Sequence, residues 1–178
     1  MVSAALAVGL GIGVADTASA ATITPPSGYQ EIVSTNLTGS GGARECLDET
    51  DGSLEPGAVI QDFHCHGFAS NGAPQLWDFL LTRFGDYEIL NKNSDMCLTA
   101  NPGGAIGQDP TRQEPCGPPG SGQEWSLLDE GSLGFQLVNV DSGGTLCLSV
   151  RPSGVQGDHA QTTLLVCSTN AKNQLWQF

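Results

Sequence analysis

The heptapeptide Ala-Pro-Gln-Leu-Trp-Asp-Phe, residues 73–79, carries the pattern that decides the fold. In it a Gln stands two residues before a Trp, and Trp is scarce, with three copies in 178 residues. The same spacing returns twice along the chain, giving Gln75-Leu76-Trp77, Gln123-Glu124-Trp125 and Gln174-Leu175-Trp176. Recurrence at intervals of 48 and 51 residues indicates an internal repeat, which has to be identified before single residues are interpreted.

The cysteines follow the same period. Three of the six are each followed by Leu, and each has a second Cys 19 or 20 residues downstream: Cys46 and Cys65, Cys97 and Cys116, Cys147 and Cys167. An even number of cysteines in a secreted chain indicates disulfides, although the count alone leaves many connectivities open. If the three units are built alike, the bonds join the two cysteines within each unit. A thiolate metal site is disfavoured because no Cys-x-x-Cys pair occurs.

The N-terminal end has the pattern of a targeting segment. An apolar run precedes Ala18-Ser19-Ala20, a small-x-small triplet typical of signal-peptidase cleavage. The run is shorter than the ~20 residues that a membrane-spanning helix needs. We therefore expect a signal peptide over residues 1–20, a linker over 21–27, one domain over 28–178, and secretion to the extracellular space.

The chain is strongly acidic. Its formal net charge is −13, and the loss of Asp16 with the signal peptide would leave −12. Such a charge keeps a protein soluble and disfavours nucleic acids and anionic membranes as partners.

Short runs of β-type composition, separated by Gly, Pro, Asn and Asp, predict four strands in each unit and twelve in all. The strands are expected at Gln30–Thr35, Glu45–Glu49, Val59–Cys65 and Leu76–Thr82, then Asp86–Asn91, Met96–Ala100, Thr111–Cys116 and Glu124–Leu128, then Gly134–Val140, Leu146–Val150, Thr162–Cys167 and Gln174–Phe178. One such unit cannot bury its own apolar face, so the three units are expected to close on one another.

Three units with Gln-x-Trp, Cys-Leu and a second Cys resemble the ricin-type β-trefoil lectin family over about residues 28–178. The resemblance implies an all-β trefoil of three pseudo-symmetric repeats, about 28–84, 85–132 and 133–178. Its fold would be a six-stranded barrel capped by three hairpins. Trp77, Trp125 and Trp176 are then expected in the core, one per repeat, because a Trp side chain buries up to about 250 Å².

The same resemblance places a sugar site in set positions of a repeat: an Asp two residues after the first Cys, an aromatic residue two before the second Cys, and a polar pair that opens the Gln-x-Trp triplet. The first repeat meets most of these requirements with Asp48, Phe63 and Gln75, and Gln61 shares a strand face with Phe63. His66 follows the second Cys, as in bacterial xylanase-linked members of the family. These five residues form the predicted carbohydrate site.

One segment of the first repeat departs from the pattern. Pro74 stands where an Asn is expected, and the interval from Cys65 to Trp77 is 12 residues, against 9 in the other repeats. The three extra residues lie within residues 68–74 and leave two outcomes open. Asn71 or Phe68 could supply the lost group, or the insertion could fill the pocket.

The second and third repeats are expected to bind no sugar. The second has Thr99 at the Asp position, Glu114 at the aromatic position and Gly122 before its Gln. The third has Ser149 and Leu165 at the first two of these positions.

Two functions remain open for such a chain. The first is a non-catalytic carbohydrate-binding module for a neutral mono- or polysaccharide, and the second is a trefoil that has lost sugar binding and acts as a protein-binding or protease-inhibitor module. Catalysis is not expected, because the six cysteines are assigned to disulfides and no Gly-x-Ser-x-Gly accompanies the three histidines. No cofactor or metal is expected, and the protein is expected to be a monomer.

Overall fold

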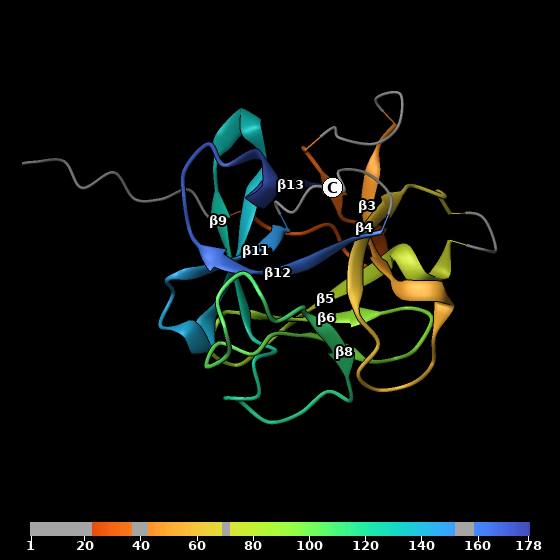
Figure 1. Ribbon diagram of the computed structural model, residues 1–178, viewed down its shortest axis with the longest axis horizontal. Coiled ribbons are helices and arrows are strands. Elements are labelled where there is room, and N and C mark those ends of the chain that lie inside the picture. Colours follow the sequence, from red (N-terminus) through yellow and green to blue (C-terminus); the bar gives the residue numbers. More distant parts are fainter. Residues whose placement is uncertain (1–22, 37–42, 69–71, 152–158) are drawn as a thin grey trace, which may run out of the picture.

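The computed structural model describes residues 23–36, 43–68, 72–151 and 159–178, which are coloured in Figure 1. This part of the chain consists of strands, short 3₁₀ turns and loops, and contains no α-helix. No helix within it is long and apolar enough to cross a membrane. The predicted signal peptide lies outside the described residues, as do residues 21 and 22 of the predicted linker.

The described residues form thirteen strands. They are β1 (Gln30–Glu31), β2 (Val33–Ser34), β3 (Glu45–Glu49), β4 (Ile60–His64) and β5 (Leu76–Leu81), then β6 (Tyr87–Asn91), β7 (Cys97–Thr99), β8 (Arg112–Glu114) and β9 (Trp125–Asp129), then β10 (Phe135–Asn139), β11 (Leu146–Val150), β12 (Ala160–Val166) and β13 (Trp176–Gln177). The 3₁₀ turns are η1 (Thr50–Gly52), η2 (Ala73–Gln75), η3 (Gly131–Leu133), η4 (Val140–Ser142) and η5 (Lys172–Gln174).

The count exceeds the predicted twelve because the first predicted strand divides at Ile32. Before this residue β1 pairs with β5, and after it β2 pairs with β3 and β13. The Ile32 side chain is fully buried, and its carbonyl accepts a hydrogen bond from the Leu47 amide. One segment thus pairs first with β5 and then with β3 and β13, and the strand is interrupted where its partners change.

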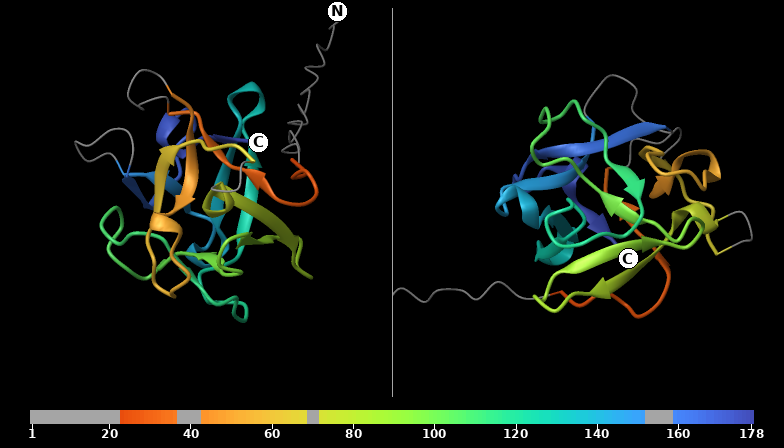
Figure 2. Two further views of the ribbon diagram at one scale, coloured as in Figure 1. Left: turned by 90° about the vertical axis from the view of Figure 1, so that its right-hand side faces the viewer. Right: turned by 90° about the horizontal axis from the view of Figure 1, so that it is seen from below.

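Six strand positions close into a barrel. Antiparallel pairing runs from β1 to β5, β6, β9, β10 and β13, and β13 returns to β2, the continuation of β1. The remaining strands form three hairpins, β3–β4, β7–β8 and β11–β12. Figure 2 shows the first-repeat hairpin in orange beside the blue strands of the third repeat, where β4 pairs with β12. This is the architecture expected of a β-trefoil.

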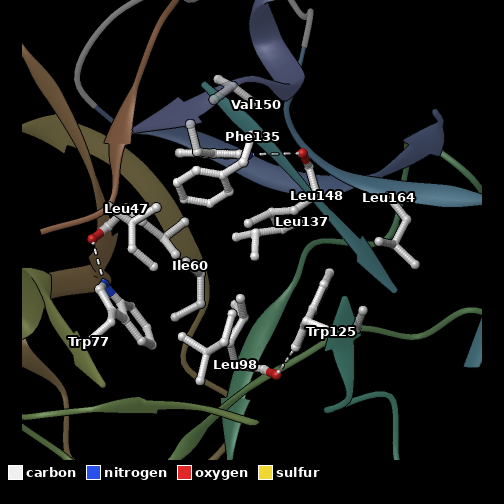
Figure 3. Close-up of a cluster of buried hydrophobic side chains, with 14 of the residues drawn as sticks. Leu47, Ile60, Trp77, Leu98, Trp125, Phe135, Leu137, Leu148, Val150 and Leu164 are labelled. Carbon is white, nitrogen blue, oxygen red and sulfur yellow. Dashed lines mark hydrogen bonds between the residues drawn. The ribbon is translucent and has the colours of Figure 1, made fainter. Parts of the chain in front are cut away.

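The core uses one Trp from each repeat in the same way. Trp77, Trp125 and Trp176 are fully buried. Each indole Nε1 donates to the carbonyl of the Leu that follows the first Cys of its own repeat: Leu47 at 2.8 Å, Leu98 at 3.0 Å and Leu148 at 3.3 Å. Figure 3 shows two of the indoles together with these buried leucines. The recurring Trp is thus a core residue, as predicted, and the hydrogen bond explains why Phe does not replace it.

Three disulfides join the predicted partners. They link Cys46 to Cys65, Cys97 to Cys116 and Cys147 to Cys167, with Cα–Cα distances of 5.1, 5.0 and 5.0 Å. Each bond ties the two strands of one hairpin together. Because each closes a loop of 19 or 20 residues, each is expected to stabilise the fold by roughly 3 kcal/mol.

Candidate functional site

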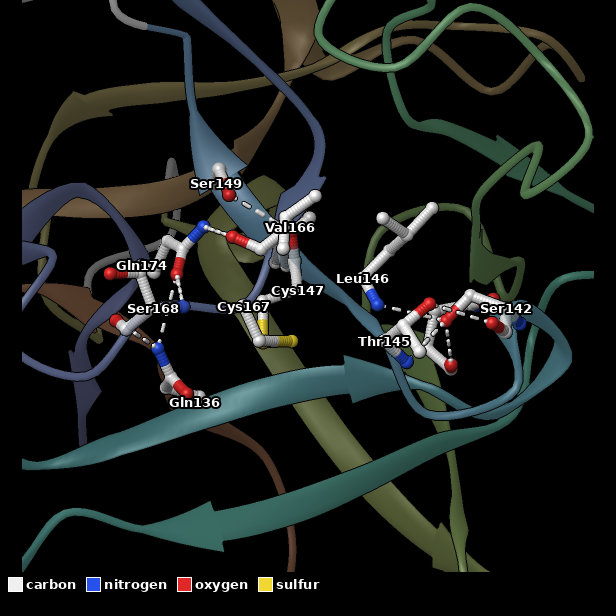
Figure 4. The surroundings of a disulfide bond; sticks show 12 residues. Gln136, Ser142, Thr145, Leu146, Cys147, Ser149, Val166, Cys167, Ser168 and Gln174 are labelled. Atoms are coloured by element: carbon white, nitrogen blue, oxygen red, sulfur yellow. Dashed lines mark hydrogen bonds between the residues drawn. A yellow bond between two sulfur atoms is a disulfide. The ribbon is translucent and has the colours of Figure 1, made fainter.

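The Gln of each triplet forms two hydrogen bonds to the backbone on either side of the second Cys of its repeat, and we call this pair of bonds the backbone clamp. Its Oε1 accepts from the amide of the residue after that Cys, at 2.7 Å from His66, 2.7 Å from Gly117 and 2.9 Å from Ser168. Its Nε2 donates to the carbonyl of the residue before that Cys, at 2.9 Å to His64, 3.0 Å to Pro115 and 2.9 Å to Val166. Figure 4 shows this clamp in the third repeat beside the Cys147–Cys167 disulfide. Each Gln side chain therefore satisfies two part-buried backbone groups, and loss of these hydrogen bonds would be costly.

The register of the first hairpin gathers the predicted polar and aromatic groups on one face. Asp48 is the cross-strand partner of Gln61, and Cys46 is the partner of Phe63. Because residues two apart on a strand share a face, Asp48, Gln61 and Phe63 lie together. Gln61 Nε2 donates to Asp48 Oδ1 at 2.8 Å, so the amide orients the carboxylate.

A cavity of about 250 Å³ opens over this face. Nine residues line it: Asp48, Glu49, Asp51, Gly52, Gln61, Phe63, His66, Pro74 and His159. Four of the five predicted site residues are among them. The cavity combines a carboxylate–amide pair with an aromatic ring and two imidazoles, which can pair hydroxyl groups and cover an apolar C–H face.

Gln75, the fifth predicted residue, is not among the residues that line the cavity. Its side chain is fully buried and does not line the cavity, because both ends of its amide serve the backbone clamp. Burial raises the pKa of Asp48, and a hydrogen bond from the Gln75 side chain acts to lower it, which favours the charged carboxylate. The structure gives Gln75 a positioning role, and its sugar contact stays a prediction.

Burial shifts the pKa of the two adjacent carboxyls that line the cavity, Asp48 and Glu49. It raises the pKa of Asp48 above its ordinary value, and the hydrogen bond from Gln61 offsets part of that effect. Burial also raises the pKa of Glu49 to about 7. The Ser53 amide donates a hydrogen bond to Glu49 Oε1 at 2.8 Å, which offsets part of this increase. Both carboxyls therefore hold a proton more readily than in water.

His159 enters the site from the third repeat, which the sequence did not predict. Its Nδ1 lies 3.1 Å from Gln61 Oε1, and its ring centroid lies 4.8 Å from that of Phe63. The pairing of Ala160 with Asp62 brings β12 beside β4 and so delivers the preceding histidine to the cavity. The only sequence signal for this contact was the closure of the three repeats on one another, which does not name the residue.

The inserted segment does not cover the cavity with an aromatic side chain. Phe68 is 71% exposed and is not among the lining residues, whereas Pro74 forms part of the wall. Asn71, proposed as a replacement for the missing amide, lies outside the described residues.

The equivalent faces of the other repeats carry different groups. The second repeat has a larger cavity of about 370 Å³, lined by Thr99, Ala100, Asn101, Asp109, Pro110, Arg112 and Glu114. Register places Arg112 where the first repeat has Gln61 and Glu114 where it has Phe63. In the third repeat Ser149 is buried and bonds its own hairpin at Cys147 O. Absence of sugar binding in these two repeats stays a prediction.

One group of three possible metal ligands occurs within the described ranges, and its chemistry argues against a metal centre. It consists of Glu31, Cys46 and Cys65. The two sulfur atoms are joined in a disulfide and offer no thiolate, so this group is not a metal site.

Comparison with known proteins decides the family. A model of the ricin-type β-trefoil lectin domain matches residues 33–176. The chain belongs to this family. No curated protein matches the sequence of this chain.

Solved structures share the fold of this ricin-type domain at low sequence identity. The designed threefold symmetric protein ThreeFoil is 24% identical, with a TM-score of 0.70 over 85% of this chain and 97% of its own. The Rhizoctonia solani agglutinin is 19% identical, with a TM-score of 0.65 over 89% and 98%. The C-terminal half of an earthworm R-type lectin, in complex with GalNAc, is 16% identical, with a TM-score of 0.62 over 84% and 95%.

Proposed function

We propose that this protein is a secreted, non-catalytic lectin whose sugar site is the cavity of the first repeat. The observation that carries the proposal is the Asp48–Gln61 pair, held at 2.8 Å on the same hairpin face as the Phe63 ring and open to that cavity. Membership in the ricin-type family makes carbohydrate the expected class of ligand.

Each lining group has a chemical task toward a sugar. The Asp48 carboxylate accepts hydrogen bonds from two neighbouring hydroxyls, and its second oxygen is not used by Gln61. The Phe63 ring offers an apolar face for the C–H side of the sugar ring. His66 and His159 stand on the cavity wall, where their imidazoles can donate to or accept from further hydroxyls.

The cavity favours a neutral sugar over an acidic one. Asp48, Glu49 and Asp51 all line it, and the whole chain carries a net charge of −13. A uronic or sialic carboxylate would meet this field as a like charge, which costs binding free energy. Neighbours of the same fold are in complex with neutral GalNAc and, in an earthworm lectin mutant, with the acidic 6'-sialyllactose, so the preference for a neutral sugar rests on the charges of this cavity.

A single site implies weak binding. One shallow sugar site typically reaches a dissociation constant of about 1 mM, or about −4.1 kcal/mol. Lectins gain avidity from several sites that act together, which one site in a monomer cannot provide. The ligand is therefore expected to be a polysaccharide with many copies of one sugar, or a surface that presents it densely.

The proposal of secretion rests on the chemistry of the chain. Residues 1–20 have the composition of a signal peptide, and all six cysteines are paired in disulfides. Disulfides form and persist outside the reducing cytosol. Membership in the ricin-type lectin family supports the non-catalytic assignment.

A glycan array with the oxidised chain tests the function, with two matched variants. Asp48→Ala removes the carboxylate of the first repeat and should abolish binding while the thermal transition is kept. Thr99→Ala changes the register-equivalent residue of the second repeat and should leave binding unchanged. Equal retention of sugar by wild type and Asp48→Ala would refute the site. No binding by the wild type would refute the function and turn the search to protein partners.

A further inference from the structure

The rings of all three histidines pack against Phe63 of the first hairpin, and two of the histidines form a close pair. His64 Nε2 and His66 Nε2 lie 3.0 Å apart, and their ring planes are inclined by 76°. The histidines flank Cys65 and are two residues apart, so in a regular strand their side chains would share a face. Although β4 ends at His64, the two imidazoles stay together, with ring centroids 4.7 Å apart.

The backbone clamp of Gln75 fixes this arrangement. Gln75 Nε2 donates to the His64 carbonyl at 2.9 Å, and Gln75 Oε1 accepts from the His66 amide at 2.7 Å. Between the two histidines, Cys65 is tied to Cys46 by the disulfide. The Phe63 ring packs against both imidazoles, at centroid distances of 4.2 and 5.5 Å. The two ring nitrogens are therefore held close together before any ligand arrives.

Two nitrogen lone pairs at this separation suit a metal ion. With metal–nitrogen bonds of about 2.0–2.1 Å, two atoms 3.0 Å apart subtend roughly 91–97° at the ion. A tetrahedral centre would hold them about 3.3 Å apart, whereas neighbouring positions of a square-planar or octahedral centre match the observed spacing. Imidazole is a preferred ligand of Cu²⁺ and Ni²⁺, which adopt such geometries.

We propose that His64 and His66 form a bidentate site for a divalent transition-metal ion, Cu²⁺ or Ni²⁺, at the edge of the first-repeat cavity. Without metal, the 3.0 Å contact is a hydrogen bond in which one Nε2–H donates to the other Nε2. Metal binding requires a lone pair on both Nε2 atoms, so that proton moves to Nδ1 or to solvent. Water or a second ligand completes the coordination.

The electrostatic surroundings favour a dication. Glu45 is the cross-strand partner of His64 and is buried. Glu31 accepts from the Gly67 amide, one residue beyond the pair. Asp48 lines the same cavity as His66. Glu31 is shared with Arg44 at 3.9 Å, and carboxylates near the pair offset part of the charge of the ion.

The pair is specific to the first repeat, although the clamp is not. Gln123 clamps Pro115 and Gly117, and Gln174 clamps Val166 and Ser168, by the same two hydrogen bonds. These repeats supply the scaffold without the imidazoles. They therefore provide internal controls for the role of the clamp.

Copper titration of the oxidised chain tests the site, with calorimetry for affinity and electron paramagnetic resonance for the ligands. We expect one Cu²⁺ per chain with two coordinated nitrogens. Loss of a second-shell partner costs about 10–100-fold in affinity, so loss of a ligand in His66→Ala should cost on the order of 100-fold or more. His159→Ala removes the third histidine of the same cavity and should leave the affinity and spectrum unchanged. Equal loss in both variants, or a wild-type spectrum without two nitrogens, would overturn the assignment.

A gain-of-site variant covers the case in which His66→Ala fails to fold. Pro115→His with Gly117→His places two imidazoles on the Gln123 clamp of the second repeat. This variant should bind two Cu²⁺ ions per chain, each with two coordinated nitrogens. A folded variant that still binds a single ion would contradict the claim that the clamp creates the chelating geometry.

Discussion

The indole Nε1 of Trp77 donates a hydrogen bond to the Leu47 carbonyl at 2.8 Å, and both residues are fully buried. This bond links the barrel strand β5 to the hairpin strand β3 of the same repeat. The other two repeats contain the equivalent bond, which lengthens to 3.3 Å between Trp176 and Leu148. One polar contact inside an apolar core thus joins barrel and hairpin three times.

Trp77→Phe should destabilise the protein by roughly 2–4 kcal/mol. The change leaves the buried Leu47 carbonyl without its donor and opens a cavity beside it. Trp176→Phe should cost less, because its hydrogen bond is longer and weaker. Denaturant unfolding of the oxidised chains measures both values. Equal losses in the two variants would show that volume, and not the hydrogen bond, determines the cost.

Gln75→Ala should cost roughly 2–4 kcal/mol, more than a change at the cavity surface. The variant leaves the His66 amide and the His64 carbonyl without their buried partner. Asp48→Asn keeps the shape of the site and should change stability by less than about 1 kcal/mol. The midpoints of urea unfolding compare the two. A Gln75→Ala chain as stable as wild type would remove the positioning role assigned to this residue.

Gly122→Ala should destabilise the second repeat by about 3 kcal/mol or more. Gly122 has φ +81°, and an added Cβ would overlap the Ala100 carbonyl oxygen, which belongs to the backbone. Gly131 also has positive φ, at +63°, but has open space around a Cβ. Gly131→Ala should therefore cost only about 1–2 kcal/mol, the backbone term alone. Thermal melts separate the two contributions, and similar shifts would show that the overlap is relieved by movement.

Much of the fold was predictable because equivalent residues make the same contacts in each of the three repeats. Each Trp bonds a Leu carbonyl, each Gln clamps a hairpin end and each Cys pair ties two strands, so spacing alone revealed the unit. Turn residues predicted the strand ends to within two residues, as at β12, which begins at Ala160 where Thr162 was expected. The break at Ile32 could not be predicted, since it depends on partners in β5 and β13 that lie far away in the sequence.

Only the part of the candidate site that lies on the first-repeat hairpin was predictable from the sequence. Strand alternation and register place Asp48, Gln61 and Phe63 on one face, and these are local properties. His159 was missed because it arrives through pairing of the first and third repeats. The backbone bonds of Gln75 were not predictable, because the sequence does not tell whether an amide faces a cavity or the backbone, and here the backbone uses both ends of the amide.

Glu49 should make stability depend on pH in an unusual direction. Burial raises its pKa from 4.5 in the unfolded chain to about 7 in the fold. Between these values the folded protein keeps a proton that the unfolded chain has lost. The free energy of unfolding therefore falls as pH rises from about 4.5 to 7, and Glu49 contributes no further change above that range.

Glu49→Gln should remove this component, because Gln resembles the protonated carboxyl and carries no titrating group. Each tenfold change in proton affinity corresponds to about 1.4 kcal/mol, so wild type should lose up to about 3 kcal/mol more than the variant between pH 4.5 and 7.5. Glu55→Gln, which changes an exposed carboxyl on the same loop, should follow wild type. Urea unfolding at a series of pH values gives the three curves. Parallel curves for wild type and Glu49→Gln would mean that water or a local rearrangement solvates the Glu49 carboxylate in the folded state, and that its burial does not govern its proton.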